Sequence, residues 1–169
     1  MSLRLREGAL PHLLELYAAT GENVHLALLA GTEALYVARL TGPGSVPTLS
    51  RMGGRLPLHT TGVGKALLAT RDAAWLDDYF ALPRERETIH SVTDEAALRA
   101  EIARTRETGY ATTRQEMTLG NVSIAAALPP LAGLPPAAVG VVTHLGRADE
   151  GRLAPLILRT AAEIGRDLG

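Results

Sequence analysis

The chain has 169 residues, a length that suits one domain. Hydrophobic residues make up 46% and charged residues 21%, a balance typical of a folded domain that excludes a disordered chain. The net charge of −1 argues against a free-standing nucleic-acid binder, and the lack of cysteine excludes disulfides, thiolate metal sites and cysteine nucleophiles.

The first predicted element is an amphipathic helix over residues 7–20, which Gly21 is placed to end. Its apolar side chains follow the i, i+3, i+4, i+7 spacing of one helix face: Leu10, Leu13, Leu14 and Tyr17. Two short apolar runs come next, at residues 23–31 and 34–42, and predict a β-hairpin. A third strand is predicted at residues 48–53, after turn residues 42–47.

The middle of the chain predicts three helices, at residues 61–70, 72–81 and 93–108. Thr93 and Asp94 can cap the last of them, and Gly109 is placed to close it.

The remaining third of the chain predicts strands at residues 110–117 and 121–128, and a central strand at 137–145 that is apolar on both faces. A final helix starts near Asp149. Its buried stripe consists of Leu153, Leu156, Ile157, Ala161, Ile164 and Leu168. Hairpins dominate and the helices cluster, so we expect one α+β domain over residues 1–169 with a mostly antiparallel sheet.

Residues 59–70, HTTGVGKALLAT, look at first like a phosphate-binding loop that opens a helix. The spacing excludes that interpretation, because the phosphate loop requires G-x-x-x-x-G-K-[ST]. His59 stands in place of the first glycine, and Ala66 follows the lysine where a hydroxyl would hold Mg²⁺.

The start of this helix suits a different ligand. Thr60 or Thr61 can act as the N-cap, which leaves the amides of Gly62, Val63 and Gly64 without partners inside the helix. Such amides can bind a carboxylate. In the alternative interpretation, the glycines allow the helix to pack closely on the sheet and the amides meet water.

The run RMGGRLPLHTTGVGKALLA, residues 51–69, resembles the signature of the IclR family of bacterial transcription regulators, R-x-G-x-x-x-P-L-H-x-T-x-x-G-K-A-x-L-A. Residues 11–43, 87–111 and 114–128 are similar to further blocks of the family, so the resemblance covers almost the whole chain. It implies a GAF-like fold, with a six-stranded, mostly antiparallel sheet and helices on its faces. Residues 1–20 would form a linker and dimerisation helix.

The resemblance also implies an effector pocket between the sheet and the loops before the 61–70 helix, with Gly62 and Val63 supplying backbone amides. The family's acidic side chain falls on Thr113 and its cysteine on Ser123. Wall positions fall on Thr48, Leu56 and Asn121, and Thr143 or His144 substitutes for serines of the last strand.

Most of these residues also have a purely structural interpretation. Ser123 and Thr113 are small enough to be simple strand residues, and Asn121 can cap the turn at Gly120. His144 can be a hydrogen-bonded core histidine. Glu116 can pair with Arg114 or Lys65, and His59 is expected to be a helix-entry residue.

Metal or cofactor binding is not expected, because the five histidines lack ligand spacing: His12, His25, His59, His90 and His144. The expected function is a small-molecule sensor domain without enzyme activity. Two alternatives stay open. One is a small GAF-like enzyme built on Ser123 and His144, and the other is an oligomerisation module whose pocket is filled by side chains.

The expected partners are a small organic effector that bears a carboxylate and further copies of the chain, as a dimer or tetramer. DNA would be bound only through a winged helix-turn-helix domain, which precedes this domain in the family and is absent from this sequence. No secretory signal opens the chain and no apolar run reaches the ~18 residues of a membrane span, so we expect a cytoplasmic protein without a membrane partner.

Overall fold

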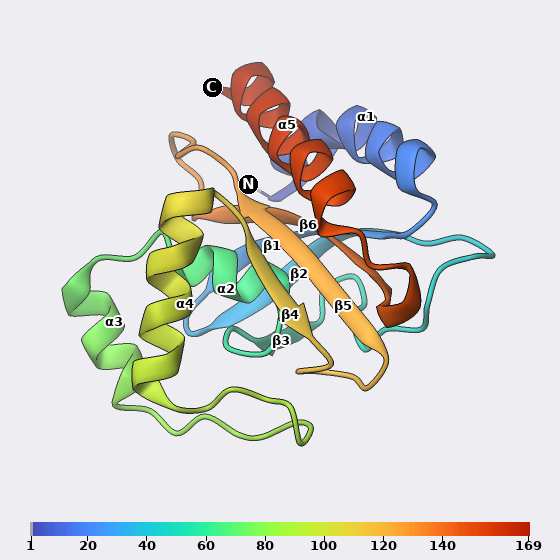
Figure 1. Ribbon diagram of the computed structural model, residues 1–169. Helices are drawn as coiled ribbons and strands as arrows, with labels where there is room; N and C mark the ends of the chain where they lie inside the picture. The colour runs from blue at the N-terminus through green and yellow to red at the C-terminus, as the bar shows by residue number, and fades with distance from the viewer. Residues whose placement is uncertain (1) are drawn as a thin grey trace.

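The computed structural model describes residues 2–169 and contains one antiparallel sheet of six strands, in the order β3-β2-β1-β6-β5-β4 (Figure 1). The α+β architecture predicted from the element order is confirmed. In chain order the elements are α1 (Ser2–Thr20), β1 (Asn23–Ala30), β2 (Glu33–Leu40), β3 (Arg55–Pro57), α2 (Gly62–Leu68), α3 (Ala73–Phe80), α4 (Glu95–Thr108), β4 (Ala111–Arg114), β5 (Asn121–Ala127), β6 (Ala137–His144), a 3₁₀ turn (Leu145–Arg147) and α5 (Glu150–Leu168).

Strands β1 and β6 lie side by side at the centre of the sheet, which confirms the central position predicted for residues 137–145. Both strands are buried on both faces over most of their length. The hairpin of β1 and β2 is confirmed as well, with a bulge where Leu26 pairs with Ala38 and Ala27 pairs with Tyr36.

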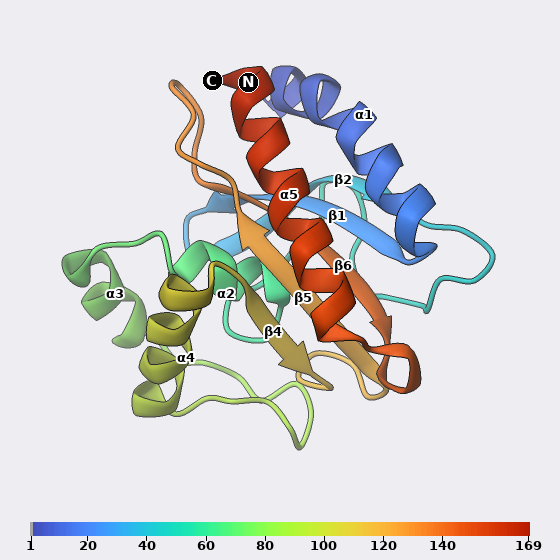
Figure 2. The same ribbon diagram turned by 45° about the horizontal axis from the view of Figure 1, so that its top comes forward.

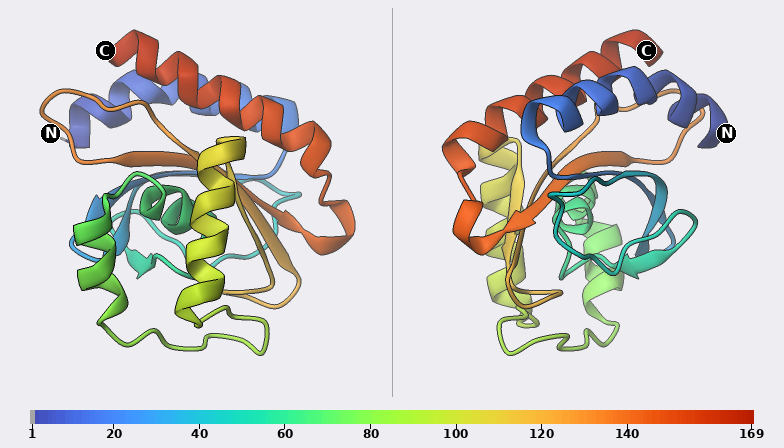
Figure 3. Two further views of the ribbon diagram at one scale, coloured as in Figure 1. Left: turned by 60° about the vertical axis from the view of Figure 1, so that its left-hand side comes forward. Right: turned by 90° about the vertical axis from the view of Figure 1, so that its right-hand side faces the viewer.

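Helices cover both faces of the sheet (Figure 3). On one face α1 and α5 pack together over β1, β5 and β6, with Leu13, Ile157 and Ile164 fully buried between them and the sheet. On the other face α2 lies against β5 and β6, and α3 and α4 lie outside it. Each face therefore has its own apolar core, and the second core surrounds the helix that carries the HTTGVGKALLAT motif.

The caps predicted for the helix at residues 93–108 are confirmed at Asp94 and Gly109. The side chain of Asp94 accepts a hydrogen bond from the Ala97 amide at the start of α4, and Gly109 ends that helix with a φ of +88°. The side chain of Asp149 likewise accepts from the Arg152 amide at the start of α5.

The prediction of a third strand at residues 48–53 is wrong. The strand that pairs with β2 is β3, at Arg55–Pro57, and Gly53 precedes it with a φ of +76°. The backbone of Tyr36 in β2 bonds to Gly53 and Gly54, so the turn carrying this positive φ fixes where pairing begins. Residues 48–53 form a loop instead.

The strand predicted at residues 110–117 is shorter than expected, because β4 ends at Arg114. The next residue, Gln115, has a φ of +56°, a conformation that breaks the extended backbone. Residues 115–120 then form an irregular connection to β5.

The first helix is confirmed, but only Leu13 and Tyr17 of its predicted apolar stripe pack against the core. The sheet and α5 cover Leu13 and Leu16, whereas Leu10 is 39% exposed and Leu14 is 50% exposed. This sequence has apolar residues on more than one face of the helix. The spacing alone therefore does not decide which face the sheet covers.

The two ends of the described chain lie close together where α1 and α5 run side by side (Figure 2). The guanidinium of Arg4 donates a hydrogen bond to the backbone carbonyl of Leu168 over 2.9 Å. Within residues 2–169, no helix is both long enough and apolar enough to cross a membrane.

Candidate functional site

A cavity lies between the start of α2, the central strands and the loop that precedes β3. The centre of a water-sized sphere has about 50 Å³ to move in there. By the same measure one water molecule needs about 10–15 Å³, so the cavity has room for several waters or a small organic molecule. Its volume is not filled by the protein's own side chains.

Seven of the nine residues named as candidates from the sequence line this cavity: Thr48, Leu56, Gly62, Val63, Thr113, Asn121 and Ser123. They come from the loop at 48–50, from β3, from the start of α2 and from the β4–β5 pair. The lining also includes His25, Tyr36, Ser50 and Met117.

The two candidates from the last strand are not among the residues that line the cavity, which corrects their placement there. Thr143 donates a hydrogen bond to Glu22 Oε2 over 2.6 Å. His144 is exposed at the end of β6, where its Nδ1 accepts from the Gly146 amide over 2.9 Å. The alternation of side chains along β6 and the end of the strand there direct these two residues to other partners.

The first turn of α2 presents backbone donors to the cavity. Thr61 is the N-cap, with its hydroxyl accepting from the Gly64 amide over 3.1 Å. No hydrogen bond within residues 2–169 uses the amides of Gly62 or Val63. Both residues line the cavity.

The two glycines of the motif, Gly62 and Gly64, lack room for a side chain for different reasons. A Cβ on Gly64 would collide with the backbone of Leu58, so this glycine lets α2 approach the preceding chain. A Cβ on Gly62 would lie 2.6 Å from Ser123 Oγ, at the cavity wall. The packing interpretation therefore holds for Gly64, while Gly62 keeps space open beside a polar side chain.

Two hydroxyls form the wall opposite Gly62. Thr113 on β4 and Ser123 on β5 are directly paired across the strands, and their hydroxyls share a hydrogen bond. Both residues are buried. Each hydroxyl still has capacity for a further hydrogen bond, because a hydroxyl has one donor and two acceptor positions.

A histidine that the sequence did not single out lies at the cavity. His25 Nε2 is 2.7 Å from Ser50 Oγ, which is 2.8 Å from Thr48 Oγ1. Burial, reinforced by the positive charge of Arg39, lowers the pKa of His25 from 6.5 to about 3. The imidazole is therefore neutral at pH 7. In the sequence, the only indication that His25 lies at a site is its position as a polar residue within an apolar strand.

The lysine of the motif points away from the cavity into an ion-pair network. Its Nζ is 2.5 Å from Glu116 Oε1 and 2.9 Å from Glu101 Oε2, which confirms the expected pairing with Glu116. Burial raises the pKa of the Glu116 carboxyl, and the Lys65 ammonium opposes that rise. Lys65 thus joins α2 to α4 and to the segment after β4, and does not act as a phosphate ligand.

The polar groups of the cavity are neutral. Its lining contains no Asp, Glu, Lys or Arg, and its residues of types that bind transition metals are His25 and Met117. His59 lies at the entry to α2, with Nε2 2.7 Å from the carbonyl oxygen of Glu85. The cavity therefore offers two amides, several hydroxyls, one neutral imidazole and an apolar wall.

Comparison with known proteins identifies a single family over the whole domain. Residues 1–166 match the family described as "Bacterial transcriptional regulator IclR C-terminal". The HTH-type transcriptional regulator XynR of Escherichia coli is 32% identical over 154 residues, which cover 90% of this chain and 61% of that protein. The Pca regulon regulatory protein of Pseudomonas putida is 31% identical over 169 residues, covering 99% of this chain and 58% of that protein.

Solved structures similar to this chain belong to the same family. An IclR homologue from Microbacterium hydrocarbonoxydans, crystallised in complex with 4-hydroxybenzoate, superposes with a TM-score of 0.93 at 32% identity and covers 99% of this chain and 69% of that one. The IclR protein of Thermotoga maritima gives a TM-score of 0.91 at 29% identity, with 98% and 68% covered. The chain spans 58–61% of the length of the curated relatives named above.

Proposed function

This chain belongs to the IclR family of bacterial transcriptional regulators, matching its C-terminal domain, and from that premise we propose that its cavity binds a small organic effector that bears a carboxylate. One observation carries the proposal. The free amides of Gly62 and Val63 face a cavity that contains no side chain of opposite or competing charge.

The proposed ligand follows from the groups in the wall. A carboxylate accepts hydrogen bonds from the two amides, and such charge-assisted bonds are stronger than neutral ones. The hydroxyls of Thr113 and Ser123 meet polar neutral groups elsewhere on the ligand. Tyr36, Leu56 and Val63 supply apolar surface for its carbon skeleton. The 4-hydroxybenzoate bound by the Microbacterium homologue is a ligand of this type.

The effect on transcription would arise by linkage. An effector that binds one conformation of the oligomer better shifts the population toward it, and only by the difference between its two affinities. We propose that DNA is bound by a separate domain on the N-terminal side of α1, since this chain matches the C-terminal part of the family and carries a net charge of −1. Such a regulator works beside the chromosome, in the cytoplasm.

Catalysis by Ser123 and His144 is the less favoured alternative. A serine nucleophile needs a base within hydrogen-bond reach. Here the Ser123 hydroxyl bonds to Thr113, and His144 Nδ1 accepts from the Gly146 amide. The relatives are named as transcriptional regulators. A purely structural module is less favoured because the cavity has open volume.

Thermal unfolding with small organic acids tests the proposal. A ligand that binds only the folded state raises its stability by about 2.7 kcal/mol at a concentration of 100 Kd. We use 4-hydroxybenzoate and aliphatic hydroxy and keto acids, each beside its uncharged amide. We expect an acid to stabilise the chain while its matched amide does not. Equal stabilisation by acid and amide would exclude the carboxylate, and stabilisation by neither across the set would argue against an effector of this class.

A further inference from the structure

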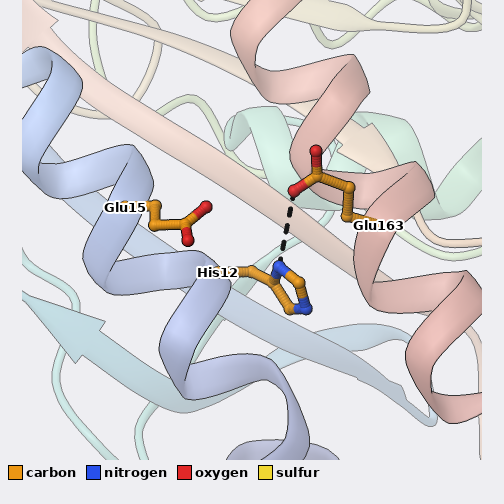
Figure 4. A group of neighbouring side chains, drawn as sticks. All are labelled: His12, Glu15 and Glu163. Atoms are coloured by element: carbon orange, nitrogen blue, oxygen red, sulfur yellow. Dashed lines mark ion pairs between the residues drawn. The ribbon is translucent and has the colours of Figure 1, made fainter.

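A cluster of metal-ligating side chains lies far from the cavity, between the two helices on the opposite face of the sheet (Figure 4). His12 and Glu15 lie on α1, and Glu163 lies on α5. One ligand atom from each residue lies within 4.8 Å of the other two. His12 and Glu15 are three residues apart on a helix, so their side chains share one face.

The histidine of this cluster has one ring nitrogen satisfied and one not. Nε2 lies 2.6 Å from Asp167 Oδ2, one helical turn beyond Glu163 on α5. Nδ1 is buried and has no hydrogen-bond partner, although it faces Glu163 Oε2 at 3.4 Å (Figure 4). When Nε2 carries the hydrogen and donates it to Asp167 in a hydrogen bond, Nδ1 of the neutral ring carries a lone pair.

A lone pair facing a carboxylate is unfavourable unless a positive species lies between them. We propose that His12 Nδ1 and the carboxylates of Glu15 and Glu163 bind a divalent transition-metal ion, which clamps α1 to α5. An imidazole with two carboxylates suits Zn²⁺ or Mn²⁺ better than Mg²⁺ or Ca²⁺, which take oxygen ligands alone. Water completes the coordination sphere on the side of the exposed Glu15.

The residues around His12 resemble those around a metal-bound histidine. A metal-binding imidazole commonly donates its second N–H to a carboxylate, which fixes its tautomer and orientation, and Asp167 is placed to accept it. Glu163 also pairs with Arg159, whose Nε is 3.8 Å from Oε1 and whose side chain is 67% exposed. It leaves Oε2 to the metal. Glu15 has no ion pair within residues 2–169.

The position of the clamp gives it a consequence beyond effector binding. The family match is to a C-terminal domain, so α1 is the element nearest to the part that precedes it in the relatives. A metal ion that fixes α1 on α5 would set the direction in which the chain leaves this domain. The clamp and the effector cavity lie on opposite faces of the sheet, so each can be tested with the other intact.

Calorimetric titration of the metal-free 169-residue chain with Zn²⁺ at pH 7 tests the clamp. We expect one ion per chain. His12→Gln and Glu163→Gln each lower the affinity at least ~10-fold, and Asp167→Ala lowers it about 10–100-fold by removing the acceptor that orients the imidazole. The matched control is His90→Gln, which removes an exposed histidine of the 86–93 loop and should bind as the unmodified chain does.

A second measurement separates the metal from a proton, since a protonated His12 would form ion pairs with Glu163 and Asp167. Zn²⁺ should shift the ring-nitrogen NMR signal of His12 Nδ1, and it should raise the melting temperature of the chain but not of His12→Gln. Circular dichroism verifies that each variant folds. Equal binding by His12→Gln, or no binding together with an imidazolium signal at His12, would overturn the metal site.

Discussion

Gly62 and Gly64, which are separated by one residue, have different structural roles in this domain. A side chain on Gly64 would collide with the backbone of Leu58, which has no flexible end that can move aside. Gly64→Ala should therefore destabilise the fold by about 1–3 kcal/mol, the usual cost of overpacking. Urea unfolding of the variant measures this. Gly62→Ala meets the side chain of Ser123 instead, so we expect it to impair ligand binding more than stability.

The paired hydroxyls of Thr113 and Ser123 allow a direct test of the polar wall. A lost hydrogen bond costs about 1 kcal/mol, and more if a buried partner stays unpaired. Ser123→Ala and Thr113→Val should each weaken effector binding about five-fold or more while leaving the fold intact. Titration calorimetry measures the affinity, and circular dichroism reports the fold. Unchanged affinity in both variants would contradict the polar wall while leaving the family assignment in place.

The neutral histidine of the cavity should make stability depend on pH. The pKa of His25 falls from 6.5 to about 3 on folding, so the unfolded chain binds more protons between those values. Its contribution is fully present above pH 6.5 and is lost as the pH falls toward 3. Between pH 7 and pH 5 we expect a loss of about 2 kcal/mol.

The comparison variant for this effect is His25→Gln, which keeps a polar group near Ser50 but does not titrate. Urea unfolding at both pH values should show a smaller loss in the variant. Burial also lowers the pKa of His59, which adds a loss in the same direction, but that contribution is common to both proteins and cancels. An equal pH dependence in the two proteins would mean that His25 is not held neutral.

At the scale of elements, Lys65 connects three segments. It lies on α2 and bonds to Glu101 on α4 and to Glu116 beyond β4, with its own side chain only 3% exposed. Lys65→Met would leave two carboxylates close together without a cation. We expect a loss of about 3–5 kcal/mol, the usual cost of removing one partner of a buried ion pair.

Thermal unfolding of Lys65→Met measures that loss, and the double variant Lys65→Met/Glu116→Gln provides the control. Removing the charge of Glu116 as well should restore part of the stability, because the penalty comes mainly from the uncompensated buried carboxylate. A double variant less stable than the single one would show that Lys65 contributes through packing of its stem rather than through charge.

At the scale of the whole molecule, the exposed face of α1 favours self-association. Leu3, Leu10 and Leu14 are 62%, 39% and 50% exposed, and their spacing places them along one side of the helix. We propose that a second copy of the chain covers them. Sedimentation should show dimers or tetramers at micromolar concentration, and Leu10→Glu/Leu14→Glu should shift the distribution toward monomers. A wild-type chain that stays monomeric at high concentration would exclude this arrangement.

Much of this fold was predictable because it depends on residues close together in the chain. The caps at Asp94 and Gly109 act within one helical turn, so their sequence positions were sufficient. The hairpin of β1 and β2 follows from two apolar runs and a short turn. The family motif predicts Gly62 and Val63 beside the pocket, and both residues line the cavity.

The tertiary structure alone decided what depends on segments that are distant in sequence. Periodicity could not show which face of α1 would be buried, because α5 and the sheet make that choice. The sequence of residues 48–53 predicts a strand, whereas the structure has a loop there, in which Ser50 contacts the distant His25. Thr143 forms a hydrogen bond with Glu22 and does not line the cavity. His12 lies beside Glu163, which comes from the opposite end of the chain. Contacts of this kind form only when folding brings distant segments together, so a local sequence pattern does not predict them.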